Sequence, residues 1–537
     1  MTEPGSAGPP RKWAALAVLA TGLSMIVVDG TIVGVALPVI IGDLSLDISD
    51  AQWINSLYSV VFAALLLTAG SLGDRLGRRR LFVVGVVVFA AGSLLAGLAS
   101  GAGGLIAARV VQGVGGAAVL PATLSTVNAV FRGRDRVIAF AIWGSVISGM
   151  AAVGPLLGGW LTSSASWQWI FLVNLPIAAV VLVGAWLVVP ETRAEAAEPG
   201  RDVVGLLLSV LGFGAVVFAV IEGAALGWWR PAADFAVLGF TWPRTAPVSI
   251  VVPSAAIGLL ALALFVAWER HRARTGRSVI LDLGLFGVPT FRWGNLTALA
   301  VAVGEFGLLF VLPLFLVNVL AMSTMSAGLV LAAMAAGAFA SGAAARHLAA
   351  RLGPPKVVVA GLLLEVIAVL AIALVVGPEI SPWLLALLLV GYGAGLGLAA
   401  AQLTGTTLAD IPAAKSGQGS ATQSTVRQLG AALGTAIAGA VLAFGLSGAT
   451  EAELLAAHVP PPAAHELAEG TRESAGALIG ELRATDPAVV PALSRGFGDA
   501  TRDAVLFNAA FLVLGLVGAA RVSTVATRWE IAAASRE

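Results

Sequence analysis

Long apolar runs, separated by short polar segments, fill most of this 537-residue chain. A helix needs about 20 consecutive apolar residues to cross the hydrocarbon core of a membrane. We therefore predict fourteen transmembrane helices, near residues 13–42, 51–72, 81–100, 103–130, 137–163, 167–189, 203–225, 248–268, 292–320, 325–345, 357–377, 382–408, 417–445 and 504–522. Only 11% of the residues are charged, against about 25% in soluble domains, so composition also indicates an all-α integral membrane protein.

The basic residues predict how the chain is oriented. Lysine and arginine favour cytoplasmic loops. If the N-terminus is inside, the two tails and alternate loops hold 23 of the 31 basic residues. The first apolar run is too long for the core of a cleaved signal peptide. We predict a multi-pass protein of the cell membrane with both termini in the cytoplasm.

An internal repeat predicts the domain organisation. The stretches "RLGRRRLFVVG" (75–85) and "RLGPPKVVVAG" (351–361) are similar and lie 276 residues apart. The same offset places Asp29 opposite Glu305. We predict a six-helix half at 1–190, two additional helices with linkers at 191–290, and a second six-helix half at 291–537 that includes a long outside loop, 446–503. Repeats of this kind are typical of transporters with a substrate site near the midplane.

Two acidic residues lie midway along predicted helices. Asp29 is the only ionisable residue between Trp13 and Gly42, and Glu305 is the only acid in the ninth run. A charge at a helix centre costs roughly 2.5–3.5 kcal/mol on insertion scales, so such residues face a cavity or a partner. Because burial disfavours the charged form of a carboxyl group, we interpret both as proton and cation sites that face one central cavity. The alternative is a hydrogen-bonded structural acid. We expect removal of the charge on Asp29 to leave the fold intact.

Two more charged residues, Arg427 and Glu365, are second-tier candidates. Arg427 lies in the thirteenth run. Two interpretations stay open: a role in proton coupling, or a side chain that extends to the cytoplasmic interface. Glu365 lies midway along the eleventh run, and Glu222 lies at the outer end of the seventh. The sequence leaves the roles of Glu365 and Glu222 open.

The most specific motif is "GSLGDRLGRRRLF" at 70–82, a glycine-rich turn between two predicted helices. It resembles the signature between the second and third spans of the major facilitator superfamily, although Gly73 stands where alanine is common. The resemblance implies a gating role for six residues: Gly70, Gly73, Asp74, Arg75, Gly77 and Arg78. Asp74 is placed to cap the next helix or to pair with a neighbouring arginine.

Further motifs narrow the resemblance to the 14-span QacA/EmrB-type drug:proton antiporters. "VDGTIVGVALP" (28–38) resembles their first-span aspartate motif, and "LIAARVVQGVGGAA" (105–118) resembles the fourth-span motif whose arginine, here Arg109, is implicated in proton coupling. "GMAAVGPLLGG" (149–159) resembles the fifth-span motif of exporters. Its small residues and proline predict close helix packing: Gly149, Gly154, Pro155, Gly158 and Gly159. Gln168 and Ser424 depart from the family pattern.

The resemblance implies proton-coupled export of hydrophobic, often cationic compounds, with a dedicated exporter of one endogenous metabolite, antibiotic or lipid as the alternative. The expected partners are small substrates, protons and membrane lipid. We expect no enzyme activity and no cofactor, because the chain lacks a G-x-x-x-x-G-K-[ST] nucleotide loop. Zero cysteines and four scattered histidines predict no metal site. A net charge of +1 argues against nucleic acid.

The two longest outside segments predict local structure only. The loop 446–503 is rich in alanine and glutamate and predicts short helices that form a cap. The segment 226–247 carries several aromatic residues and predicts a hairpin at the membrane interface.

Overall fold

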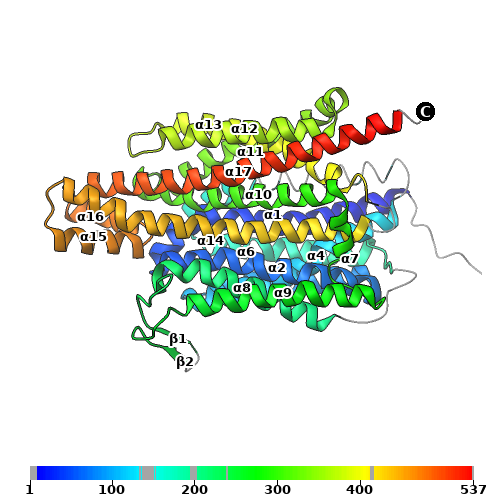
Figure 1. Ribbon diagram of the computed structural model, residues 1–537, viewed down its shortest axis with the longest axis horizontal. Helices are drawn as coiled ribbons and strands as arrows, with labels where there is room; N and C mark the ends of the chain where they lie inside the picture. The colour runs from blue at the N-terminus through cyan, green and yellow to red at the C-terminus, as the bar shows by residue number, and fades with distance from the viewer. Residues whose placement is uncertain are drawn as a thin grey trace, which may run out of the picture.

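Long helices running side by side along one axis form almost the whole molecule (Figure 1). The computed structural model describes residues 9–131, 135, 139, 150, 153–193, 202–237, 240–411 and 416–534. Its long helices are α1 (Pro9–Leu44), α2 (Ile48–Leu76), α3 (Arg78–Gly97), α4 (Ala102–Val130), α7 (Asn174–Val188), α8 (Val203–Leu226), α9 (Val251–Arg274), α10 (Pro289–Leu314), α11 (Thr324–Leu352), α12 (Pro354–Val375), α13 (Pro382–Leu408), α14 (Ser416–Ala456) and α17 (Val490–Ala534). The shorter elements are α6 (Trp169–Leu172), α15 (Pro461–Glu473), α16 (Ala477–Thr485), η1 (Leu283–Gly287), η2 (Phe315–Val319), β1 (Phe235–Val237) and β2 (Phe240–Trp242).

Within the described residues, twelve helices are long and apolar enough to cross a membrane. This finding confirms an all-α, multi-pass membrane protein. The predicted run 51–72 lies in α2, which is not among the twelve. The predicted run 137–163 falls mostly outside the described residues, although residues 153–164 are helical.

The internal repeat is visible in the helix boundaries. The offset of 276 residues carries both ends of α2 onto the ends of α11, and the start of α3 onto the start of α12. The packing repeats as well, because α3 and α2 pack against α4 as α12 and α11 pack against α13. Each half is therefore built around corresponding helix contacts.

One glycine joins the paired helices in each half. Gly77 links α2 to α3 with φ +114°, and its repeat counterpart Gly353 links α11 to α12 with φ +84°. L-amino acids with a side chain rarely adopt these angles, so glycine is required. At the first turn, Glu191 accepts a hydrogen bond from Arg79 N at 3.1 Å and lies 3.7 Å from Arg80 Nε.

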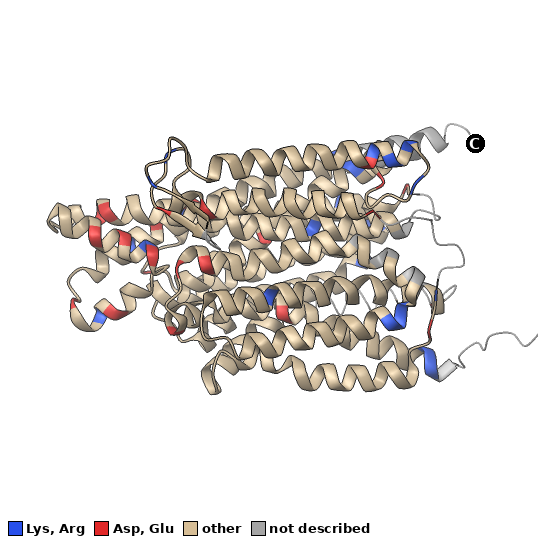
Figure 2. Cartoon of the chain, turned by 90° about the horizontal axis from the view of Figure 1, so that it is seen from below, with Lys and Arg blue, Asp and Glu red and all other residues tan. Residues whose placement is uncertain are grey.

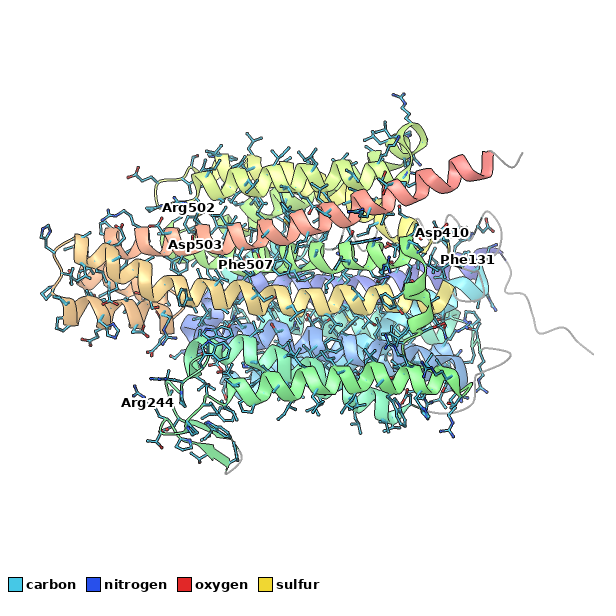
Figure 3. The ribbon with its side chains drawn as sticks, viewed as in Figure 1. Phe131, Arg244, Asp410, Arg502, Asp503 and Phe507 are labelled. Atoms are coloured by element: carbon cyan, nitrogen blue, oxygen red, sulfur yellow. The ribbon has the colours of Figure 1, made fainter. Side chains whose placement is uncertain are left out.

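The loops divide the molecule into two ends. The hairpin β1–β2 and the helices α15 and α16 lie at one end, here named the hairpin end; α1 begins and α17 ends at the other, the terminal end (Figure 1). Figure 3 shows Arg244 at the hairpin end, and Phe131 and Asp410 at the terminal end. The predicted hairpin and the predicted short helices are both present. Lysine and arginine gather mainly at the terminal end (Figure 2).

The two halves meet along α2 and α14 near the hairpin end. Gln52 Nε2 donates to Ala436 O at 2.8 Å, and Ser56 Oγ donates to Ala432 O at 3.1 Å. We call this contact the α2–α14 seam. The additional helix α8 packs against both α2 and α14 and so covers the seam.

Glycines of the predicted exporter motif also lie where helices approach closely. A Cβ added at Gly158 would come within 2.7 Å of Ile32 O on α1, and one at Gly159 within 2.9 Å of Thr324 O on α11. A Cβ at Gly328 of α11 would meet Pro155 O at 2.6 Å. The segment 153–164 therefore packs against α1 of the first half and α11 of the second half through small residues. Gly154 packs against α1 as well, whereas Gly149 lies outside the described residues.

Candidate functional site

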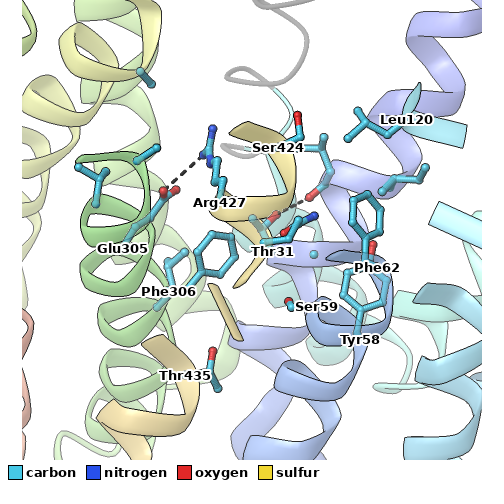
Figure 4. A pocket seen from close by; sticks show the side chains of 18 of the residues that line it. Thr31, Tyr58, Ser59, Phe62, Leu120, Glu305, Phe306, Ser424, Arg427 and Thr435 are labelled. Carbon is cyan, nitrogen blue, oxygen red and sulfur yellow. Dashed lines mark hydrogen bonds and ion pairs between the residues drawn. The ribbon is translucent and has the colours of Figure 1, made fainter. Parts of the chain in front are cut away.

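A cavity of about 250 Å³ lies between the two halves (Figure 4). Helices α1, α2 and α4 line it from one half, and α10, α13 and α14 line it from the other. On α14 and α13 the lining reaches Ser420 and Thr404, near the terminal end. At the opposite end the halves are joined at the α2–α14 seam, so the cavity extends from the middle of the molecule towards the terminal end.

The cavity wall mixes apolar, aromatic and polar side chains. Figure 4 shows Phe62 and Tyr58 on one side and Phe306 on the other, with Thr31, Ser59 and Ser424 between them. The ionisable side chains in the lining are those of Tyr58, Arg109, Glu305 and Arg427. Such a wall suits a ligand with a large apolar or aromatic body and a few polar groups.

Asp29 lies in a buried polar cluster beside the cavity. Its Oδ2 is 2.5 Å from Nη1 of Arg109, and both residues are almost fully buried, at 0% and 1% exposed. Its Oδ1 accepts from Gln112 Nε2 at 2.9 Å and from Asn174 Nδ2 at 3.1 Å. Both amides also donate to Ser93 Oγ. Side chains of four helices, α1, α3, α4 and α7, thus meet in one hydrogen-bonded cluster.

The guanidinium of Arg109 has further partners. Its Nε donates to Ile54 O at 3.1 Å, and its Cζ lies 4.1 Å from the centre of the Tyr58 ring, in the range of a cation–π contact. Arg109 therefore ties α2 to the cluster and does not extend to the membrane interface.

The predicted placement of Asp29 needs correction on two points. Its side chain is not among those that line the cavity, although its neighbours Gly30 and Thr31 are. The carboxylate is turned towards Arg109, because a buried charge is least unfavourable next to an opposite charge. The same pair argues against the expectation that removing the charge leaves the fold unaffected, since Arg109 would then lose its counter-charge.

Glu305 occupies the corresponding place in the second half and does line the cavity. Its Oε2 lies 3.4 Å from Nη2 of Arg427 (Figure 4). The Arg427 side chain is 45% exposed and that of Glu305 is 8% exposed. This pair is longer and more open than the Asp29–Arg109 pair, so a molecule in the cavity can reach it. Arg427 pairs with an acid and does not extend to the interface.

Glu365 lies on α12, behind the cavity wall. It is fully buried, and within the described part of the chain neither carboxylate oxygen has a hydrogen-bond partner. The hydroxyl of Tyr392, on the adjacent helix α13, is also buried without a partner among those residues. Glu222 on α8 accepts a hydrogen bond of 2.7 Å from Trp53 Nε1 on α2, at the edge of the α2–α14 seam.

The structure thus joins Asp29 to Arg109, and Glu305 to Arg427. Of the predicted gating residues, Gly70, Asp74 and Arg75 lie in α2 with side chains outside the description, Gly73 packs against Leu81, and Arg78 begins α3. Sequence reasoning missed Gln112, Asn174 and Ser93. Gln112 had a usable signal, because it follows Arg109 by three positions and so lies on the same face of α4. Among the described residues, no group of three or more His, Cys, Asp or Glu can hold a metal ion.

Two repeated helical halves around a central cavity with buried ion pairs define a secondary transporter. The chain belongs to the Major Facilitator Superfamily, whose family model matches residues 19–435. Membership of this superfamily places the protein among transporters and not among enzymes.

Several curated relatives are named as efflux, transport or resistance proteins. The chain is 34% identical to the "Multidrug efflux pump LfrA" of Mycolicibacterium smegmatis, over 81% of each chain. It is 33% identical to the "Probable actinorhodin transporter" of Streptomyces coelicolor, over 82% of this chain and 75% of that one. It is also 33% identical to the "Puromycin resistance protein pur8" of Streptomyces alboniger, over 85% and 86%.

The fold is similar to that of a solved transporter. A bacterial homologue of the human lysosomal transporter Spinster, in an inward-facing and occupied conformation, aligns with a TM-score of 0.62 at 18% identity. The alignment covers 96% of this chain and 98% of that one. At this identity, the likeness concerns the fold alone.

Proposed function

We propose that this protein is a proton-coupled antiporter that exports hydrophobic, often cationic drugs or toxic compounds across the cytoplasmic membrane. The observation that carries the proposal is the central cavity, where Glu305 and its half-exposed partner Arg427 share the wall with apolar and aromatic side chains. Glu305 can exchange a proton with water in the cavity, and a cationic substrate can take the place of Arg427. The relatives named as a multidrug efflux pump and as a multidrug resistance protein support the same activity here.

The proton gradient supplies the energy in this proposal. One elementary charge crossing the membrane corresponds to about 2.3 kcal/mol per 100 mV. Transport then needs no cofactor and no nucleotide, and the partners are the substrate, protons and membrane lipid. Asp29 and Arg109 are the second proton-linked pair, buried beside the cavity in this conformation.

We further propose the 14-span QacA/EmrB-type topology. Helix α2 is 29 residues long and packs within the bundle. The apolar sequence of the run 137–163 accounts for the remaining span in this proposal. Helices α8 and α9 are the additional pair between the six-helix halves at 1–190 and 291–537. The basic residues at the terminal end support cytoplasmic termini, because such residues favour the inner side.

A second candidate is a dedicated exporter of one endogenous metabolite, antibiotic or lipid. The relatives named as a probable actinorhodin transporter and as a tetracenomycin C resistance and export protein support it. The mechanism would be the same, and only the range of substrates would differ.

Efflux from proteoliposomes tests the proposal. Vesicles loaded with ethidium, a fluorescent cation, should release it faster when the solution outside them is more acidic than their interior. Export that ignores the gradient would overturn the antiport mechanism. Competition by several unrelated drugs supports the multidrug function, whereas no effect of any of them favours the dedicated exporter.

A further inference from the structure

A buried polar cluster joins the start of α8 to the end of α9, away from the central cavity. The hairpin β1–β2 connects the two helices at the hairpin end, so this cluster lies at the terminal end (Figure 1). Asp202 caps α8, and its Oδ1 accepts from Gly205 N and from Trp268 Nε1 of α9, both at 2.8 Å. Glu269, on α9, is 0% exposed, and its Oε2 accepts from the backbone N–H groups of residues 280–281 at 3.0 and 3.2 Å. Glu269 therefore ties α9 to the segment that leads into α10.

Each acid of this cluster has one oxygen without a hydrogen-bond donor. Asp202 Oδ2 and Glu269 Oε1 are buried and have no hydrogen-bond partner within the described part of the chain. A Cβ added at Gly205 would lie 2.6 Å from Glu269 Oε1 and 2.8 Å from Asp202 Oδ2, so the two oxygens border one small space. An ionised carboxyl group can only accept hydrogen bonds. A proton on one oxygen would supply the donor that the other lacks, because the two side chains lie within hydrogen-bonding reach.

The charges around the two acids also favour one bound proton. Arg272 Nε lies 3.1 Å from Asp202 Oδ2 but donates its hydrogen bond to Ser278 O at 2.8 Å. Helix α9 packs chiefly on α8 and η1, and neither residues 203–221 of α8 nor η1 contain an ionisable side chain. Asp282 caps η1. The other described ionisable residues nearby are exposed: Arg270, His271, Arg274 and Arg277. One guanidinium therefore faces two buried carboxyl groups.

We propose that Asp202 and Glu269 form a proton-binding site, in which one proton on Glu269 Oε1 is donated to Asp202 Oδ2. Asp202 remains ionised, because Arg272 and the N-terminus of α8 stabilise its charge. Two neighbouring carboxyl groups resist simultaneous ionisation, so Glu269 keeps the proton.

Release of this proton weakens the cluster. The O–H bond of Glu269 breaks, the proton passes to water at the terminal end, and two carboxylates then face each other beside Gly205. Their repulsion loosens the contact between α8 and α9, together with the segment that Glu269 holds. On the proposed topology the terminal end is cytoplasmic, so the site responds to cytoplasmic pH. Only this last step rests on the proposed function.

Two other protonation states compete with this proposal: both acids ionised, or Glu269 neutral through burial alone. Infrared spectroscopy of the purified full-length protein at pH 7 separates them, because a protonated carboxyl group absorbs at a higher carbonyl frequency than carboxylates and amides. Subtracting each variant spectrum from that of the wild type cancels the bands of other protonated acids. Glu269→Gln removes the group that carries the proton, and Asp202→Asn replaces the acceptor by an amide that can donate to Glu269. The control Glu379→Gln removes an exposed acid just beyond α12.

We expect Glu269→Gln and Asp202→Asn each to lose a protonated-carboxyl band, and Glu379→Gln to lose none. A band lost in Glu269→Gln alone would mean that Glu269 is neutral without Asp202. No loss in either variant would mean that both acids are ionised. Each of these two results would overturn the proposal.

Hydrogen exchange gives a second measurement that needs only the isosteric Glu269→Gln. Its amide supplies a fixed donor to Asp202 Oδ2, and its oxygen can still accept from residues 280–281. When the pH is raised from 6 to 9, the peptide that covers residues 275–288 should lose protection in the wild type, after correction for the intrinsic exchange rate, and keep it in the variant. Equal loss in both proteins would contradict the proposal. Neither measurement involves transport, so the outcome is independent of whether a pH gradient drives efflux.

Discussion

At the residue scale, the Asp29–Arg109 pair couples stability to function. The two charges lie 2.5 Å apart and away from solvent, and both side chains are also hydrogen-bonded to neutral groups. Removing one partner of such a pair costs about 3–5 kcal/mol, because the other charge remains buried without compensation. The cluster therefore holds α1 and α4 together as well as providing an acid.

We expect Asp29→Asn to lower the thermal unfolding midpoint in detergent and to abolish gradient-driven efflux. The double variant Asp29→Asn with Arg109→Gln removes both charges, so its midpoint should return towards the wild-type value while efflux stays lost. Thermal unfolding of the purified variants and ethidium efflux measure the two effects. If Asp29→Asn is as stable as the wild type, the hydrogen bonds from Arg109 to Gln112 and to Ile54 O are enough to stabilise its buried charge.

The sequence identifies the charged members of the site because ionisable residues in apolar runs are few. Asp29, Arg109, Glu305 and Arg427 stand out for this reason. Their pairing depends on how the helices rotate and pack, which hydropathy does not specify. Neutral partners such as Asn174 resemble ordinary polar residues of transmembrane helices, so composition does not single them out.

At the scale of elements, the turn at Gly77, which joins α2 to α3, lies against Glu191, just beyond the end of α7. A residue with a side chain at this φ costs about 1–3 kcal/mol of strain. A Cβ at Gly77 would also displace the Glu191 carboxylate, which bonds the start of α3. A Cβ at Gly353, the repeat counterpart, would meet no atom within 4 Å.

We therefore expect both Gly77→Ala and Gly353→Ala to be less stable than the wild type, and Gly77→Ala to lose about 1 kcal/mol more through the Glu191 contacts. The difference between their thermal midpoints isolates that contact from the backbone strain that both variants share. Equal midpoints would mean that Glu191 moves aside at no cost.

Helix α8 is a second element with a testable role, because it contacts both helices that form the α2–α14 seam. Trp53→Phe keeps an aromatic ring but removes the donor to Glu222. The lost hydrogen bond is worth about 1 kcal/mol, which shifts a two-state equilibrium about fivefold. We expect a larger fraction of molecules with the seam open.

Spin labels can measure that fraction. The chain has no cysteine, and Gly42 and Gly448 are exposed glycines at the hairpin ends of α1 and α14 with open space around them. Labels attached after Gly42→Cys and Gly448→Cys should report a larger population of long distances in the Trp53→Phe background. An unchanged distance distribution would mean that α8 covers the seam without stabilising it.

At the scale of the whole molecule, the architecture follows closely from the sequence, because apolar runs and the 276-residue repeat specify helices and their pairing within each half. The repeat predicts a central cavity, but not that it extends towards the terminal end, since that depends on how the two halves tilt against each other. The seam is closed by backbone carbonyls of Ala432 and Ala436, which no side-chain pattern reveals.

The tilt between the halves leads to a prediction about access from the two sides of the membrane. Ser424 lines the cavity that extends towards the terminal end, whereas Ser56 is fully buried in the seam near the hairpin end. In this conformation, Ser424→Cys should react with a membrane-impermeant maleimide supplied on the side of the terminal end, and Ser56→Cys should be protected from both sides. Because export requires the cavity to open alternately to the two sides, a pH gradient with ethidium present should make Ser56→Cys reactive from the side of the hairpin end and slow labelling of Ser424→Cys. Mass spectrometry of inside-out and right-side-out vesicles measures both rates. If Ser56→Cys reacts as fast before cycling as during it, the seam does not close the outer side; if it never reacts, the halves separate elsewhere.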